Sequence, residues 1–155
     1  MVKEQKHTIK KGDHYSFNWP KFYYDKSEME ITAFFTNSCM YNIPNDDGFI
    51  SKLCGIGWGT NHHANSFRIG WRANYVSNEI QLLAYFYNKS IRYSKELFSA
   101  NMHMLGSDTV KFKVFFDRVY NTIFVRGYIV TSCSGISIRK QKCEQSFIFD
   151  FNGVS

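Results

Sequence analysis

Apolar and polar residues alternate with a period of two along several stretches of the chain. This period is typical of β-strands that bury one face and leave the other polar. The alternation and the apolar runs predict strands at residues 29–36, 49–58, 66–75, 79–87, 91–100, 110–117, 122–131 and 146–151. We therefore expect a chain built mainly of strands.

Each strongly alternating stretch has one face that we expect to pack in a core. The clearest sets are Phe67, Ile69 and Trp71; Ile80, Leu82, Ala84 and Phe86; Phe112, Val114 and Phe116; and Phe147, Phe149 and Phe151. The stretch 54–72, CGIGWGTNHHANSFRIGWR, is interpreted as a glycine-bent strand, a histidine-rich loop and a core strand. Its glycines predict a bulge or a close backbone approach.

Polar turn residues separate these strands at 76–78, 88–90 and 118–121, and residues 42–48 read as a loop. The turns predict a meander of three antiparallel strands between residues 66 and 100. Residues 94–105, SKELFSANMHML, leave one alternative open, because they can also form a short helix. Many short strands with turns between them predict an all-β, antiparallel, two-sheet β-sandwich in a single domain, residues 1–155.

Two long strings carry a resemblance to known proteins. FRIGWRANYVSNEIQLLAYFYNKSIR followed by VKFKVFFDRVYNTIFVRGYIV resembles the middle of concanavalin-like jelly-roll domains, which implies a lectin-like jelly roll. KLCGIGWGTNHHANSFRIGWR with the AYFYN strand is similar to small uncharacterised proteins of Bacteroidetes and their mobile elements and phages. Jelly rolls include lectins, enzymes and capsid proteins, so the resemblance implies a fold and no single function.

Composition and charge narrow the classes of partner. The 155 residues carry a net charge of +6, which favours anionic ligands modestly. No apolar run is long enough for a membrane span, and the N-terminal MVKEQKHTIKKGD lacks the apolar region of a signal peptide. We therefore expect a cytoplasmic or particle-associated protein. Cys133 and Cys143 can meet across a hairpin as a disulfide, or stay free in a reducing compartment.

Two groups of residues offer the side chains of possible metal ligands. His62 and His63 are adjacent, but zinc needs three or four ligands and no third ligand follows nearby. The NDDG sequence at 45–48 offers carboxylates, but its spacing is that of a turn and not of an EF-hand. We assign neither a metal nor a cofactor.

The most promising candidate site is one face of the strands at 66–75 and 79–87. If these strands pair, their polar faces place aromatic rings among hydrogen-bond donors, an arrangement that can stack sugar rings or bases. The alternative is that the tyrosines pack in the interior. The candidate ligand-binding residues are His62, His63, Asn65, Arg68, Arg72, Gln81, Tyr85 and Tyr87.

No catalytic set accompanies this face. A glycosidase needs two facing carboxylates, and residues 54–93 contain one acid, Glu79. The sequence therefore favours a non-catalytic binding domain for a glycan or another small polar ligand. The alternatives are a structural or assembly protein that forms a homo-oligomer, for example in a phage particle, and a domain that binds an anionic ligand or nucleic acid.

Overall fold

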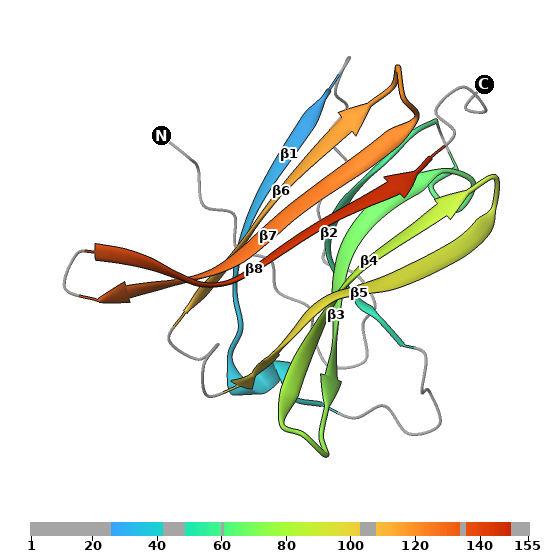
Figure 1. The fold of residues 1–155 in the computed structure, drawn as a ribbon. Helices are drawn as coiled ribbons and strands as arrows, with labels where there is room; N and C mark the ends of the chain where they lie inside the picture. Colours follow the sequence, from blue (N-terminus) through green and yellow to red (C-terminus); the bar gives the residue numbers. More distant parts are fainter. Residues whose placement is uncertain (1–25, 42–48, 60, 103–107, 134–135, 150–155) are drawn as a thin grey trace.

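The computed structural model describes residues 26–41, 49–59, 61–102, 108–133 and 136–149, apart from the side chains of 132–142. Eight strands and a short 3-10 turn make up these residues (Figure 1). The elements are β1 (Glu28–Phe34), η1 (Asn37–Cys39), β2 (Ser51–Gly57), β3 (Ser66–Asn74), β4 (Glu79–Asn88), β5 (Ile91–Asn101), β6 (Thr109–Asp117), β7 (Thr122–Cys133) and β8 (Ile136–Ile148). The NDDG sequence at 45–48 lies outside the described residues.

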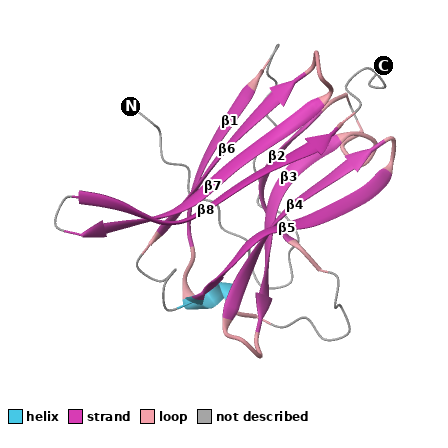
Figure 2. Ribbon diagram, in the orientation of Figure 1, coloured by secondary structure: helices cyan, strands magenta, loops and turns pink. Residues whose placement is uncertain are grey.

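The strands form two four-stranded sheets, in the orders β1-β6-β7-β8 and β2-β3-β4-β5 (Figure 2). Every neighbouring pair is antiparallel. Among the described residues, β1 lies in the first sheet, β2 to β5 form the second sheet as a meander, and β6 returns to the first sheet and pairs with β1. The predicted all-β, antiparallel, two-sheet sandwich is confirmed.

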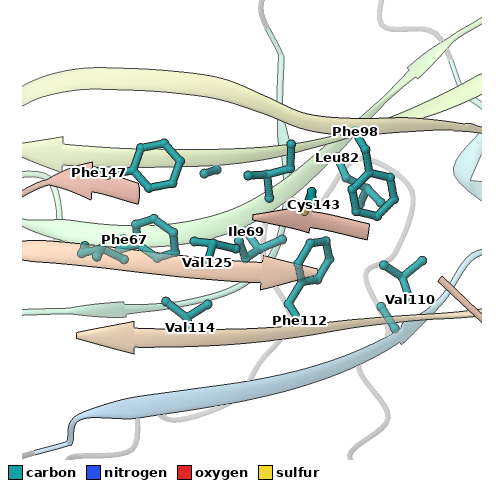
Figure 3. Close-up of a cluster of buried hydrophobic side chains, with 14 of the residues drawn as sticks. Phe67, Ile69, Leu82, Phe98, Val110, Phe112, Val114, Val125, Cys143 and Phe147 are labelled. Atoms are coloured by element: carbon teal, nitrogen blue, oxygen red, sulfur yellow. The ribbon is translucent and has the colours of Figure 1, made fainter. Parts of the chain in front are cut away.

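The core lies between the two sheets and takes side chains from both (Figure 3). Phe67 and Ile69 of β3 are buried there, as are Val125 of β7 and Phe147 of β8. Trp71 is partly buried and packs against the same cluster. The predicted inward sets on β3, β4 and β6 are therefore confirmed, while Phe151 lies outside the described residues.

Three hairpin turns use the left-handed backbone conformation. Asn78, Lys89, Ser90 and Asn121 have positive φ angles between 48° and 65°. Asn74 and Asp117 open two of these turns, because each side-chain oxygen accepts hydrogen bonds from two backbone amides that follow it. The predicted turns at 76–78, 88–90 and 118–121 are confirmed.

The alternative helix at 94–105 is wrong as far as residue 101. Residues 94–101 continue β5, and Ala100 lies opposite Ile80 while Phe98 lies opposite Leu82. The helix-forming residue types in this stretch are overridden by burial of Leu97, Phe98 and Ala100.

The suggested pairing of Cys133 with Cys143 does not form. Cys143 is a free, buried thiol opposite Gly127, whereas Cys133 lies near the hairpin end, opposite Ile136. Burial raises the pKa of the Cys143 thiol to about 11, so this group stays protonated and unreactive.

Among the described residues, no helix is long and apolar enough to cross a membrane.

Candidate functional site

The pairing of β3 with β4 brings the predicted site residues onto one face. Arg68 lies opposite Tyr85, and Arg72 lies opposite Gln81. Their neighbours along the strands, such as Phe67 and Phe86, point into the core, so these residues belong to the outer face of the β2-β3-β4-β5 sheet. The prediction that they share a face is confirmed.

Arg68 lies on the outer face of the sheet, yet it is almost completely buried although it carries a charge. Its side chain and that of Tyr85 are each 5% exposed. The guanidinium donates from Nη1 to the Tyr85 hydroxyl at 2.6 Å and from Nη2 to the His62 carbonyl oxygen at 3.0 Å. Its Cζ atom also lies 5.1 Å from the ring centre of Tyr85 and 5.4 Å from that of Tyr87. Arg68 therefore joins the backbone of His62, which precedes β3, to Tyr85 of β4.

Gly55 gives Arg68 the space to lie in this position. Gly55 is directly opposite Arg68 in the β2–β3 pair. A Cβ atom at Gly55 would lie 2.6 Å from Cγ of Arg68 and 2.5 Å from the Phe67 carbonyl oxygen. Both distances are too short, so the predicted close approach within this strand is confirmed.

A bulge in β2 places a further cation beside Arg68. The register shifts between Lys52 and Cys54, so Lys52 lies opposite Gly70 and Gly55 opposite Arg68. Both residues therefore face outward although three positions separate them. Lys52 was missed as a site residue from the sequence. Counting alternate residues back from Gly55 without the bulge assigns Lys52 to the inner face of the sheet.

Arg92 is a second site residue that sequence reasoning missed. It lies opposite Tyr87 in the β4–β5 hairpin, and its Cζ atom is 5.4 Å from the ring centre of Tyr85. The turn at 88–90 combined with alternation would have predicted its position.

Residues 61–65, which lead into β3, are tied to the β4–β5 turn by hydrogen bonds. The Asn65 side-chain oxygen accepts from the Lys89 amide at 3.0 Å, and the Ala64 carbonyl accepts from the Ser90 amide at 2.8 Å. Asn65 is buried, and its carbonyl accepts from the Trp58 amide. The contacts of Asn65 therefore shape the loop.

The two histidines lie exposed at the end of this loop. Their ring centres are 4.2 Å apart, and the His63 ring meets the Tyr87 ring edge-on at 5.2 Å. No group of three metal-ligating side chains occurs among the residues that the structure describes. The pair therefore extends the aromatic surface of Tyr87.

Positive charge dominates the electrostatics here. Burial and then the Arg68 charge lower the pKa of Lys52 below its ordinary value. The pKa of His62 is lowered by desolvation first, and then by the charges of His63, Arg68 and Lys52. No ion pair joins Arg68 or Lys52 to a carboxylate among the described residues.

Arg72 and Gln81 form a separate pair farther along the face, where Nε of Arg72 donates to Oε1 of Gln81. The other charged and aromatic residues of this site gather at the other end of β3 and β4. We call this group the basic–aromatic cluster, and it consists of Lys52, His62, His63, Arg68, Tyr85, Tyr87 and Arg92. Ser66 lies beside it, opposite Tyr87, with a buried hydroxyl that has no hydrogen-bond partner.

Comparison of the chain with protein-family profiles, with curated proteins and with solved structures gave no match.

Proposed function

We propose that this sandwich is a non-catalytic binding domain for carbohydrate, with the basic–aromatic cluster as its site. The observation that carries the proposal is the exposed edge of the cluster, where the ring of His63 meets the ring of Tyr87 and Arg92 lies opposite Tyr87 on the neighbouring strand. Aromatic rings next to flexible donors suit the faces and hydroxyl groups of sugars. Arg68 and Tyr85 support this surface from beneath.

Among the residues that the structure describes, the two carboxylates on the strands of this sheet, Glu79 and Glu96, do not form a hydrolytic pair. Glu79 accepts a hydrogen bond from Ser77 at the far end of β4, and Glu96 accepts one from Ser99 on β5. Glycosidases place two carboxyl groups on opposite sides of the bond that is cleaved, about 5–9.5 Å apart. A role in binding fits these positions better than hydrolysis does.

The resemblance to concanavalin-like jelly rolls supports the same proposal, because that group of sandwiches includes lectins. The antiparallel two-sheet architecture agrees with it. The β2–β3 loop and the β4–β5 turn lie together at one end of the sheet, joined by the Asn65 and Ala64 hydrogen bonds. Loops at the end of a rigid sandwich are a common position for ligand contacts.

A glycan array tests the proposal. Wild-type protein is compared with Tyr87→Ala, which removes the half-buried ring of the cluster, and with Tyr75→Ala, which removes an exposed ring at the opposite end of the β3–β4 hairpin. We expect glycan binding that is lost in the first variant and kept in the second. Folded wild-type protein with no hit, or equal binding by both variants, would refute the proposed site.

A second candidate is a structural role in a particle, and one apolar patch favours it. Val119, Tyr120 and Ile148 are 85%, 77% and 84% exposed, and they gather near the β6–β7 turn. Exposed apolar groups of this kind often mark protein interfaces. Light scattering behind a sizing column tests it: assembly by this patch predicts a defined oligomer that Tyr120→Ser dissociates, and a monomer at every concentration opposes it.

A further inference from the structure

We infer that the carbohydrate bound at the basic–aromatic cluster is acidic, and that its carboxylate or sulfate group lies against Lys52 and His62 in front of Arg68. The inference rests on the proposed carbohydrate-binding function and names the class of sugar. It follows from three features of the described residues: a buried cation with neutral partners, a positive rim, and an unused hydroxyl.

The buried cation is Arg68. A charged group in the interior is normally accompanied by an opposite charge, because burial removes its hydration. Among the described residues, the side-chain hydrogen bonds of Arg68 go to neutral oxygens, on Tyr85 and His62, and no ion pair joins Arg68 to a carboxylate. An anion bound above Arg68 would supply the missing opposite charge.

The rim carries the same sign as the buried cation. Lys52 from β2 and Arg92 from β5 stand on either side of Arg68 and Tyr85, and His62 and His63 close the loop end. Like charges repel one another in the free protein, so an anionic ligand relieves an electrostatic cost.

The unused hydroxyl belongs to Ser66. Its Oγ is buried without a hydrogen-bond partner, and the residue lies directly opposite Tyr87 on the cluster's face. Buried polar atoms are normally paired with protein or with an ordered water. A buried water at Ser66 would satisfy this hydroxyl and could bridge it to a ligand oxygen at the cluster.

The small extent of positive charge favours an acidic sugar over nucleic acid. Farther along the same outer face, Arg72 is held by Gln81, and the carboxylates of Glu79 and Glu96 follow on β4 and β5. Proteins that bind single-stranded nucleic acid use a positively charged groove that covers about 4–16 nucleotides. Arg72 also carries a charge, because Gln81 is neutral, but the Glu79 carboxylate follows it on the same face. Among the described residues of this face, positive charge without an intervening carboxylate is therefore confined to the cluster, which suits one or two acidic groups.

The test starts from the array, with neutral, carboxylated and sulfated glycans printed side by side. The best acidic hit and its carboxyl-reduced or desulfated counterpart are then titrated by calorimetry. Two variants accompany the wild type: Lys52→Gln in the cluster, and Lys111→Gln on the outer face of the other sheet, which also removes one exposed lysine. A single-stranded oligonucleotide is titrated as well.

We expect array hits confined to acidic glycans and binding of the neutral counterpart at least tenfold weaker. Lys52→Gln should weaken binding of the acidic glycan about fivefold, the size expected for one partly exposed charge pair, while Lys111→Gln should leave it unchanged. Equal binding of the neutral counterpart overturns the inference but leaves the proposed function standing. Absence of all glycan binding overturns both, and tighter binding of the oligonucleotide replaces the sugar with nucleic acid.

Discussion

Arg68 shows how one residue can organise a surface that it hardly reaches. From the sequence alone, Arg68 is expected to contact the ligand directly, because its guanidinium suits anions. The register prediction was correct, and Arg68 does share its face with Tyr85. Its burial could not be predicted, because it depends on the His62 carbonyl and on the space above Gly55, which come from other parts of the chain.

The Arg68–Tyr85 bond yields a stability prediction. Tyr85→Phe removes the hydroxyl that accepts from a buried guanidinium, so we expect the free energy of unfolding to fall by about 1–3 kcal/mol. Tyr93→Phe is the matched control on β5, because that ring is more exposed and its contact with Phe86 is a ring stack. Urea unfolding measures both variants. An equal loss in the two would show that the Tyr85 hydroxyl contributes nothing special.

The pKa of His62 yields a prediction on pH. Desolvation and the charges of His63, Arg68 and Lys52 lower this pKa in the folded protein, so the unfolded chain binds the proton more tightly. The lowered pKa therefore reduces the free energy of unfolding only at acidic pH. This reduction is absent well above pH 6.5 and reaches its full size below the lowered pKa of His62. An acidic ligand reverses the effect, because it favours protonated His62 and should bind more tightly as the pH falls below 6.5.

Nuclear magnetic resonance of the His62 ring measures this directly. The ring should titrate below its ordinary pKa of 6.5 in the free protein, and the midpoint should rise when acidic glycan is bound. A midpoint at or above 6.5 in the free protein would contradict the positive rim.

At the scale of elements, the β2–β3 pair depends on the missing side chain at Gly55. Gly55→Ala should destabilise the fold by about 1–3 kcal/mol, the usual cost of overpacking, because its Cβ would collide with the backbone of Phe67. Gly57→Ala is the control in the same strand, since the nearest atom to its added Cβ lies 3.5 Å away. Thermal and urea unfolding compare them. If Gly57→Ala is as harmful as Gly55→Ala, the explanation by close approach fails.

A double substitution in the β4–β5 turn should increase the stability of the protein. Lys89 and Ser90 both have positive φ angles, which Asn-Gly adopts more readily in a two-residue hairpin turn. The double substitution Lys89→Asn/Ser90→Gly should stabilise the protein by about 0.5–1 kcal/mol. The bond to Asn65 uses the backbone amide of residue 89 and is retained. A drop in the midpoint of urea unfolding would contradict this account of the turn.

The strands show where reading by alternation succeeds and where it fails. The regular strands β3 and β6 were predicted almost to the residue, because their faces alternate cleanly. Register shifts interrupt β2 after Lys52, the β4–β5 pair near Leu82, and the β7–β8 pair near Ile129. At the first shift, Lys52 was missed as a site residue. At the second, a helix remained an alternative to β5. Near the third, the first ten residues of β8 were not predicted as a strand. A bulge reverses the order of inward and outward residues, and its position depends on the partner strand.

At the scale of the whole molecule, the class of fold could be predicted and the arrangement of strands could not. Alternation and turns were enough to predict an antiparallel sandwich. The pairing of β1 with β6, across more than seventy residues, depends on which apolar faces fit together in the shared core. The site was predictable in part for the same reason: β3 and β4 are neighbours in sequence, whereas Lys52 and Arg92 come from the strands beyond them.

The central claim is that the basic–aromatic cluster is a ligand-binding surface. Titration of isotope-labelled protein with the best acidic glycan, followed by amide nuclear magnetic resonance, tests it residue by residue. The account predicts saturable shifts at Lys52, His62, His63, Tyr87 and Arg92, with Lys111 and Lys113 on the other sheet unchanged. Shifts confined to the β1-β6-β7-β8 sheet, or no saturable shifts at any residue, would contradict it.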